Sequence, residues 1–430
     1  MELKPTKPLS GFIELLPAQQ RCFDECAQRM QNVLRNCSYS RLDLPAIERA
    51  EVLTDKDNWD EIETQIFLFQ KGDTKMGLRY DGTVGLSRYV AGHLTDLTFP
   101  FYTYQFARNY RGERPQRGRY REFWQLDIDI LGVQSLSLNY DAEIVSTLMK
   151  VYDSVADIVG AVKVKVGNRR FWNAMFSYLE LDEKQSRDAF ILIDKRDKMS
   201  DFMDGMIEAV GEKAAKEIDS VFTNGYRSFV GKSIDLDNAI SEMDRFMELL
   251  NSMGVKNADI DVSIMRGHSY YTGIVFEFFS IDYPELPAVG GGGRYENLVS
   301  KFSKTKIVGV GASVGVSRLL VALMESGKID LSKFESGVDA AVLVMGDENM
   351  SYAMSVLNAF RDAGVASLAY LDTDKKFKNQ IEYADKIKAK YSVIIGENEA
   401  KDKVVTVKNM ITGDQAQLVV ADAIKLVQGR

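Results

Sequence analysis

Hydrophobic and polar residues along the first part of the chain predict one long helix and a pair of strands. Apolar side chains between Pro17 and roughly Asn36 recur at the spacing of one face of an amphipathic helix. Two later segments, Phe101–Tyr110 and Phe123–Leu131, alternate apolar with polar residues, as half-buried strands do. Because a long charged loop separates these segments, we expect them to form an antiparallel pair. A shorter hairpin is predicted before them, with strands over 67–70 and 76–80 around the turn sequence KGDTK.

The second half of the chain changes its pattern twice. From Asn168 to about Leu250, charged residues and methionines recur at helical spacing, which predicts a helical insertion. Strand patterns then return and lead into a helix over 317–324. From Asp339 onward strands and helices alternate, which predicts a small α/β domain with a mostly parallel sheet. The predicted fold class is α+β, with an antiparallel body over 1–330, a helical insertion over about 168–250 and an α/β domain over 336–430.

Composition narrows the class of protein. The 430 residues are 45% hydrophobic and 27% charged, which excludes a disordered chain, a collagen and a disulfide scaffold. The formal net charge is −8, so any binding of nucleic acid requires local basic patches. Three cysteines and two histidines support neither a disulfide framework nor a zinc site. Since neither a secretory signal nor a membrane-spanning run is visible, we expect a cytoplasmic protein with no membrane partner.

The segment Arg108–Arg121 carries the strongest chemical signal. It holds six arginines and one glutamate, and aromatic residues lie between them. Guanidinium groups bind phosphate oxygens in pairs and remain charged, so this density favours a polyanionic ligand. Aromatic faces can stack on a base while arginines hold its phosphates. A solvated basic loop is the alternative interpretation.

Three other segments are candidates for ligand contacts. In LRYDGT, Asp81 and Thr83 would share one face of a strand and suit an ammonium group, although an Asx-type turn at Asp81 fits equally well. RGHSYYTGIVFE, which begins at Arg266, places polar groups before an apolar strand. The glycines of GGGGRY, which begins at Gly290, permit close approach of the backbone to a ligand. GVGASVGVSR fits a dinucleotide loop or a flat strand beneath a nucleotide.

In their order along the chain, these segments resemble the signatures of the histidyl-tRNA synthetases, a family of class II aminoacyl-tRNA synthetases. Tyr110–Gln125 is similar to the second class signature, and the segment ending at Arg318 to the third. Arg266–Gly273 and Gly290–Tyr295 are similar to two histidine-specific signatures. The resemblance implies an antiparallel sheet flanked by helices, a homodimer and a C-terminal anticodon-binding domain. It also implies a histidine–tRNA ligase, which forms histidyl-adenylate from histidine and ATP and transfers histidine to the 3′ end of tRNA(His).

The resemblance implies roles for individual residues. Arg111 and Arg266 are expected to hold the α-phosphate of ATP, as the catalytic pair. Arg119 and Arg121 would reach the phosphates, with Arg318 and Phe123 on either side of the adenine. The α-ammonium of histidine would be held by Asp81, Thr83 and Gln125, and its imidazole would be surrounded by Asp129, Tyr271 and Tyr295. Magnesium is expected with the phosphates of ATP, and a protein-only metal site is not.

The sequence departs from the family pattern at a few positions. His268 and Ser269 stand where relatives often have Leu-Asp, and Ser317 replaces an acid before Arg318. Asp81 and Asp129 stand where many members have glutamate. The main rival is a non-catalytic synthetase-like regulatory subunit of ATP phosphoribosyltransferase. That class typically lacks the α/β anticodon module and the ATP-binding arginines, both of which this sequence retains.

Overall fold

The computed structural model describes residues 4–54, 64–196, 199–265, 271–372 and 376–429. The chain forms two compact units, which are described separately. The first comprises Met1–Glu14 and Cys26–Ile329, and the second comprises Leu15–Glu25 and Asp330–Arg430. Helix α1, predicted and found at Pro17–Asn36, contains one boundary between them.

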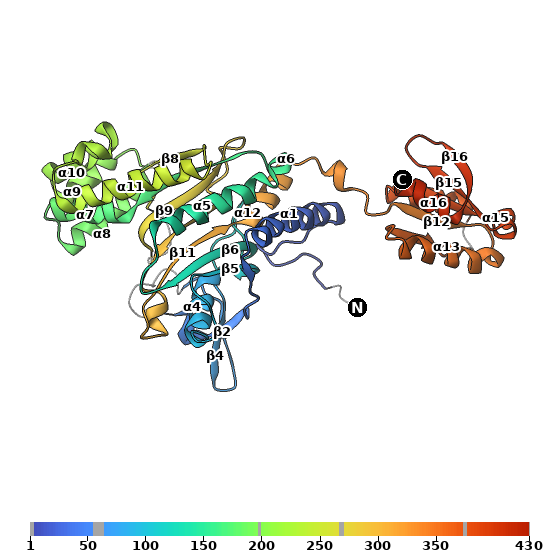
Figure 1. The fold of residues 1–430 in the computed structure, drawn as a ribbon, viewed down its shortest axis with the longest axis horizontal. Coiled ribbons are helices and arrows are strands. Elements are labelled where there is room, and N and C mark those ends of the chain that lie inside the picture. Colours follow the sequence, from blue (N-terminus) through green and yellow to red (C-terminus); the bar gives the residue numbers. More distant parts are fainter. Residues whose placement is uncertain (1–3, 55–63, 197–198, 266–270, 373–375, 430) are drawn as a thin grey trace. The chain divides into compact units, whose positions relative to one another are not determined.

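An eight-stranded sheet organises the first unit (Figure 1). Its five inner pairings are antiparallel, whereas the short edge strands β1 and β8 pair in parallel. The predicted antiparallel pair is confirmed, because β5 and β6 lie side by side over their whole shared length. In spatial order the strands are β1 (Ser40–Arg41), β5 (Phe101–Tyr110), β6 (Glu122–Val133), β11 (Ile307–Val314), β10 (Gly290–Tyr295), β9 (Tyr271–Ser280), β7 (Val162–Asn168) and β8 (Ala258–Ile260).

The two faces of this sheet differ because side chains alternate along each strand. On β6, Leu126, Ile128 and Ile130 are fully buried on one face, which α5 (Leu138–Asp153) and α12 (Val316–Glu325) cover. Figure 1 shows both helices running along this side of the sheet. The opposite face of the same strands carries polar side chains and glycines. Burial of the aliphatic face therefore fixes which side chains of β6 are available for a site.

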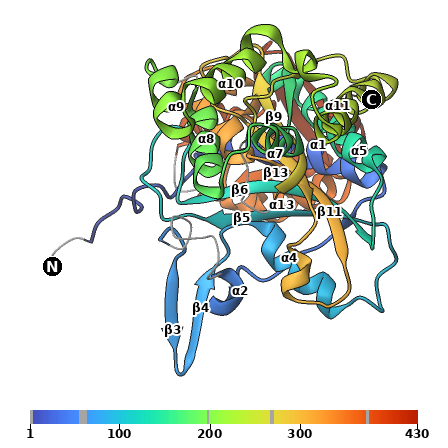
Figure 2. The same cartoon turned by 90° about the vertical axis from the view of Figure 1, so that its left-hand side faces the viewer.

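A small sheet and a helix lie beside the polar face. Strands β3 (Leu68–Lys71) and β4 (Thr74–Leu78) form the predicted hairpin, and β2 (Ile47–Arg49) pairs with β4. The hairpin extends away from the eight-stranded sheet (Figures 1 and 2). The helices of this region are α2 (Ala50–Leu53) and α4 (Gly82–Gly92).

Helices occupy the segment in which the sequence pattern predicts an insertion. They gather at one end of the first unit, where α11 packs on α5 and α7 packs on β9 (Figure 1). They are α7 (Arg169–Tyr178), α8 (Glu183–Lys195), α9 (Phe202–Val210), α10 (Glu212–Asn224) and α11 (Ile234–Ser252), after the short α6 (Ala156–Val159).

The second unit is built on a five-stranded sheet. The prediction of a mostly parallel sheet is wrong, because two pairings are parallel and two are antiparallel. Apolar clusters cover both faces of the sheet, with α13 and α16 on one and α14 on the other. In spatial order the strands are β13 (Ser367–Tyr370), β12 (Ala340–Val344), β14 (Tyr391–Ile395), β15 (Val404–Asn409) and β16 (Gln415–Val419). The helices are α13 (Met350–Asp362), α14 (Phe377–Lys386), α15 (Glu397–Asp402) and α16 (Val420–Val427).

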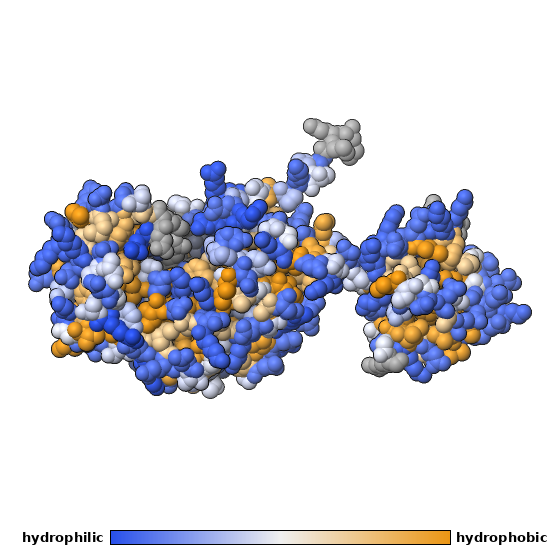
Figure 3. Space-filling model, turned by 90° about the horizontal axis from the view of Figure 1, so that it is seen from above, coloured by the Kyte–Doolittle hydropathy of each residue, from blue (hydrophilic) through white to orange (hydrophobic). Residues whose placement is uncertain are grey.

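Across the described ranges, no helix combines the length and the hydrophobicity needed to cross a bilayer. The space-filling view shows hydrophilic residues spread over both units, with apolar residues in small groups (Figure 3). The mixed helix and strand content, the large antiparallel sheet and the C-terminal α/β unit confirm the predicted fold class.

A buried ion pair ties β10 to the start of α5. Arg294 and Asp141 are 5% and 0% exposed, and the guanidinium binds both carboxylate oxygens of Asp141. Arg294 also donates to the carbonyls of Leu136 and Ser137. Burial raises the pKa of Asp141 to about 6 even though Arg294 opposes the shift. The Asp141 carboxylate therefore depends on Arg294 for its charge partner.

We expect Arg294→Met to destabilise the first unit by roughly 3–5 kcal/mol, because the substitution leaves the Asp141 carboxylate buried without its partner. The tryptophans of the described residues, Trp124 and Trp172, both lie in the first unit, so urea unfolding followed by tryptophan fluorescence reports on this unit. The double variant Arg294→Met/Asp141→Leu should recover most of the loss. A double variant no more stable than the single one would contradict this explanation.

Candidate active site

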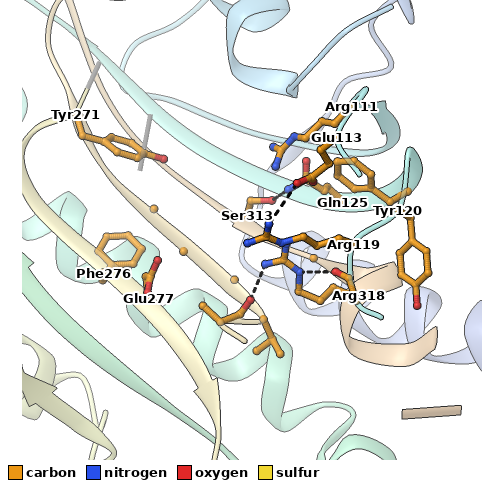
Figure 4. A pocket seen from close by; sticks show the side chains of 18 residues that line it. Arg111, Glu113, Arg119, Tyr120, Gln125, Tyr271, Phe276, Glu277, Ser313 and Arg318 are labelled. Carbon is orange, nitrogen blue, oxygen red and sulfur yellow. Dashed lines mark hydrogen bonds and ion pairs between the residues drawn. The ribbon is translucent and has the colours of Figure 1, made fainter. Parts of the chain in front are cut away.

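A pocket opens on the polar face of the eight-stranded sheet. Figure 4 shows Arg111, Arg119 and Arg318 on one side, with Tyr271, Phe276 and Glu277 on the other. The lining residues come from β6, β9, β10 and β11, from the loop between β5 and β6, and from the start of α12; they are Arg111, Glu113, Gly118, Arg119, Tyr120, Phe123, Gln125, Tyr271, Phe276, Glu277, Ala288, Val289, Gly290, Gly291, Gly292, Ser313, Gly315 and Arg318.

Backbone and aromatic contacts hold two of the pocket arginines in place. The guanidinium carbon of Arg111 lies 4.4 Å from the ring centroid of Tyr80 and 5.1 Å from that of Phe123. Arg318 donates from Nε to the carbonyl of Gly118 at 2.8 Å, and from Nη1 to the carbonyl of Ala288 at 2.9 Å. These contacts orient both guanidinium groups before any ligand arrives.

The pocket arginines also act on one another. Burial lowers the pKa of Arg318, and the neighbouring charges of Arg111 and Arg119 lower it further. Glu113 lies 3.6 Å from Arg119 and opposes this repulsion in part. Three guanidinium groups that repel one another form a site whose electrostatic energy falls when an anion such as a phosphate enters.

Ser317 explains how the start of α12 is fixed without an acid before Arg318. Its hydroxyl accepts a hydrogen bond from the backbone N–H of Trp124 at 2.8 Å. Because Trp124 lies between Phe123 and Gln125 on β6, this bond joins the helix that carries Arg318 to the strand that carries both pocket residues.

Glycines form the floor of the polar face, where a side chain would collide with its neighbours. A Cβ on Gly311 would lie 2.1 Å from Oδ1 of Asp129, and one on Gly309 would lie 2.3 Å from the ring of Tyr295. Both glycines belong to β11, which is a flat strand between β6 and β10. The structure thus supports the flat-strand interpretation of this segment over a dinucleotide loop.

The buried end of the site contains an acid and two tyrosines. The hydroxyl of Tyr295 donates to Oδ1 of Asp129 at 2.8 Å, and both side chains are almost fully buried. Tyr271 pairs with Tyr295 across β9 and β10 and lines the pocket. The structure therefore brings together the three side chains that were expected around an imidazole.

Burial raises the pKa of Asp129 to about 8. The hydrogen bond from Tyr295 opposes the shift, whereas the nearby carboxylates of Asp127 and Asp81 add to it. In the unfolded chain an aspartate loses its proton near pH 4. The folded protein thus binds one more proton than the unfolded chain between about pH 4 and pH 8, so this acid lowers stability as the pH rises through that range.

We expect Asp129→Asn to stabilise the ligand-free protein relative to the wild type, and more at pH 8 than at pH 5. The difference between the two pH values should be on the order of 1–3 kcal/mol, since asparagine has no proton to lose. Urea unfolding at both pH values, followed by tryptophan fluorescence, measures this. Parallel pH profiles for the two proteins would rule out a protonated Asp129 in the folded state.

Hydrogen bonds connect the pocket lining to a deeper acid. Asn109 donates from Nδ2 to Oε1 of Gln125 at 2.6 Å, and Gln125 donates from Nε2 to the hydroxyl of Ser313 at 2.7 Å. Ser313 in turn hydrogen-bonds the side chain of Asp127. This relay (Asn109, Gln125, Ser313 and Asp127) fixes the orientation of the Gln125 amide.

The strand prediction for Asp81 and Thr83 is wrong, and the turn alternative is closer. Strand β4 ends at Leu78, and Asp81 is the N-cap of α4, where its Oδ1 accepts from the backbone N–H of Val84 at 3.0 Å. Aspartate side chains commonly compete with strand hydrogen bonding in this way. Thr83 lies in the first turn of the helix, and neither residue is among those that line the pocket.

The other predicted site residues fall into three groups. Arg111, Arg119, Phe123, Gln125, Tyr271 and Arg318 line the pocket. Asp129, Tyr295 and Arg121 do not line the pocket. The first two are buried, and the Nε–H of Arg121 donates to the carbonyl of Glu113 at 3.3 Å. Arg266, His268 and Ser269 lie outside the described residues.

Sequence reasoning missed four polar residues of the site: Glu113, Asp127, Glu277 and Ser313. Asp127 could have been found, because it lies two residues from both Gln125 and Asp129 on one strand and must share their face. Glu277 and Ser313 come together only through the register of β9, β10 and β11, which no local pattern encodes. Within the described part of the chain, acids, histidines and cysteines form no metal-binding cluster.

Comparison with known proteins gives a consistent assignment. The family model described as histidyl-tRNA synthetase matches residues 11–319, and the one described as anticodon binding domain matches residues 339–430. A histidine–tRNA ligase of Clostridium tetani is 36% identical, covering 98% of this chain and 97% of that protein.

Solved structures agree with this assignment. The crystal structure of histidyl-tRNA synthetase from Nostoc sp. PCC 7120 superposes with a TM-score of 0.86 at 28% identity, covering 100% of both chains. A Bacillus halodurans structure described as an ATP phosphoribosyltransferase regulatory subunit/histidyl-tRNA synthetase has a TM-score of 0.73 at 19% identity. It covers 92% of this chain and 99% of its own, and the likeness concerns the fold alone. By sequence over nearly its full length, this chain belongs to the histidyl-tRNA synthetase family.

Proposed function

We propose that this protein is a histidine–tRNA ligase that activates histidine with ATP and transfers it to the 3′ end of tRNA(His). Family membership supports the reaction, and the arrangement of the pocket supports its chemistry. The observation that carries the proposal is the placement of Arg111, Arg119 and Arg318 in one pocket with Tyr271, which is the cross-strand neighbour of Tyr295 in the buried Asp129–Tyr295 pair.

In the first step, a carboxylate oxygen of histidine attacks the α-phosphorus of ATP. The new P–O bond forms as the bond to pyrophosphate breaks, so negative charge gathers at the phosphorus. Arg111 would stabilise this charge because its guanidinium group is already held at the pocket wall by the rings of Tyr80 and Phe123. Arg119 would bind phosphate oxygens. Phe123 and Arg318 would enclose the adenine. Arg266 would stabilise the negative charge on the α-phosphate together with Arg111. Arg121 does not line the pocket, and its proposed role is to reach the phosphates of ATP from outside this lining.

Histidine would occupy the inner end of the pocket. Tyr271, Tyr295 and Asp129 would contact the imidazole, while Asp81, Thr83 and Gln125 would hold the α-ammonium. A site that hydrogen-bonds both imidazole nitrogens leaves its own buried polar groups unpaired when another amino acid enters. Such a site rejects isosteric side chains by a factor of ~10⁴ or more.

Magnesium fits the pocket as a companion of ATP rather than as a resident ion. Mg²⁺ is commonly bound by one or two carboxylates together with substrate phosphates. Glu113 and Glu277 are the acidic side chains of the lining, and either could complete its coordination. When bound, Mg²⁺ would neutralise charge on the β- and γ-phosphates.

The proposal extends to the rest of the assembly. In the second step the terminal ribose hydroxyl of the tRNA attacks the carbonyl carbon of histidyl-adenylate, and AMP leaves. The 1–330 body would perform both steps, and the 336–430 domain would bind the anticodon, as the family match to residues 339–430 supports. A cytoplasmic homodimer is the proposed working form, supported by the likeness of the first helix and the segment around Pro45 to the dimer signature of the family.

ATP–pyrophosphate exchange with each of the twenty amino acids tests the proposal. We expect exchange that depends on histidine and on no other amino acid. A protein that bound ATP but exchanged with none of them would instead fit the regulatory-subunit alternative. Exchange with a different amino acid would overturn the assignment of the substrate.

A further inference from the structure

Asp127 lies at the centre of the polar face, between two residues already assigned to histidine. Gln125, Asp127 and Asp129 alternate along β6 and therefore point to the same side of the sheet. Across the sheet, Asp127 faces Gln105 on β5 and Ser313 on β11. The side chain is 5% exposed, so it is held inside the protein rather than at the surface.

One oxygen of this carboxylate lacks a hydrogen-bond partner in the part of the chain that the structure describes. Ser313 hydrogen-bonds the Asp127 side chain, but Oδ2 has no hydrogen-bond partner within the described residues. Arg79, which directly follows β4, carries a positive charge near Asp127. Its guanidinium group, however, donates to the backbone carbonyls of Arg108 and Leu44. A buried carboxylate without a direct cation is costly, which indicates that something else binds it in the working protein.

The surroundings of Oδ2 are rich in acceptors. Oε1 of Gln105 and Oδ1 of Asn109 are also buried without partners in the described structure. Gln105 uses its Nε2 to donate to the carbonyl of Gly82, directly beside the N-cap Asp81. A Cβ on Gly82 would lie 2.6 Å from Oδ2 of Asp127, so this carboxylate lies against the start of α4. The charge of the neighbouring Asp81 is close enough to raise the pKa of Asp127.

An ammonium group suits this cluster of hydrogen-bond acceptors better than a metal ion does. Lysine-type ammonium groups carry three donors and no acceptor, and an α-ammonium has the same donor set. In the described part of the chain Asp81, Asp127 and Asp129 form no metal-binding cluster. We propose that Asp127 is a specificity-determining residue whose Oδ2 accepts a hydrogen bond from the α-ammonium of the amino-acid substrate, together with Asp81. This inference rests on the proposed function, because it assumes that histidine occupies the pocket.

The charges that face Asp127 predict how binding depends on pH. Burial raises its pKa to about 6, and Asp81 adds to the shift, whereas the Ser313 hydroxyl, Arg79 and Arg111 oppose it. The carboxylate is therefore charged at pH 7.5 and mostly protonated at pH 5. Attraction for an ammonium group should weaken as the pH falls through this range.

The test compares L-histidine with 3-(imidazol-4-yl)propanoate, which lacks only the α-ammonium. Calorimetric titration of Asp127→Asn should show a loss of affinity for L-histidine of roughly 10–100-fold, since a charge-assisted bond is removed. Affinity for the analogue should change by less than about threefold, because the analogue never makes this bond. Asp244→Asn, which removes a carboxylate paired with Arg227 on the insertion, is the matched control and should bind both ligands as the wild type does.

Equal losses for the two ligands would show that Asp127 is merely structural, and an unchanged affinity for L-histidine would also refute the inference. If wild-type protein binds no histidine, the proposed function fails instead. If Asp127→Asn does not fold, the pH dependence of binding by the wild-type protein tests the inference instead. After each affinity is corrected for the measured imidazole ionisation of its own ligand, the ratio of the L-histidine affinity to the analogue affinity should fall by roughly tenfold between pH 7.5 and pH 5, because the ammonium contact is the difference that remains. A ratio independent of pH would overturn the inference.

Discussion

Arg111→Ala is expected to slow histidine-dependent ATP–pyrophosphate exchange by ~10²–10³-fold, because it removes a fixed cation from the charge that develops at the α-phosphorus. The Arg111 guanidinium lies over the rings of Tyr80 and Phe123, so it is positioned in advance and has little freedom to lose. The effect should fall mainly on kcat rather than on KM for ATP, as expected for an interaction that strengthens in the transition state.

Two further variants sharpen this measurement. Arg111→Lys should recover little activity, since an ammonium group neither stacks between aromatic rings nor binds a phosphate with two parallel hydrogen bonds. Arg108→Ala is the matched control, because Arg108 lies near the end of β5, shortly before Arg111, where it pairs with Glu122 and lies over Trp124, outside the pocket lining. Exchange by Arg111→Ala at the wild-type rate would remove Arg111 from the mechanism.

Removal of the residues after Gly337 is expected to abolish most aminoacylation while sparing amino-acid activation. We expect kcat/KM for tRNA charging to fall by about 10²-fold or more, because binding energy from a remote part of the substrate is lost. Pyrophosphate exchange should stay within several-fold of the full-length protein, since every residue lining the pocket lies before the deletion. The truncated chain also keeps Phe334 and Glu335, whose carbonyls accept hydrogen bonds from Arg21 on α1.

Exchange activity serves as the folding control for the truncated protein. If exchange and charging fall together, the deletion has damaged the first unit. If charging persists at the wild-type level while exchange is intact, the second unit does not bind tRNA, and the proposed role of residues 336–430 is wrong.

Local patterns predicted those elements whose two faces differ. The pair β5 and β6 alternates between an aliphatic face and a polar face, and its predicted segments agree with the structure. Strand β16 shows the opposite case, since nearly all of its side chains are exposed and neither of its faces is buried. The sheet of the second unit is therefore mixed, because β15 and β16 join it by antiparallel pairing that alternating strands and helices did not indicate.

Residues of the candidate site could be predicted where they belong to a recognisable sequence motif. The other residues are placed by the pairing register of the β-strands, which the sequence does not reveal. The arginine-rich segment marked Arg111 and Arg119, and both line the pocket. Asp81 was found by its motif, but its strand assignment failed because its own side chain caps a helix. The sequence did not predict Ser313 as a site residue, because only the pairing of β6 with β11 brings it opposite Asp127.

The glycines of β11 restrict how this enzyme can be redesigned. Any side chain at Gly309 or Gly311 would collide with Tyr295 or Asp129, so a replacement there disrupts the buried end of the site instead of enlarging it. Variants meant to admit a bulkier amino acid should therefore carry smaller side chains in the pocket lining, at Tyr271 or Phe276. Libraries that randomise the two glycines should return the parental residues, whereas libraries at Tyr271 and Phe276 should return new substrate preferences.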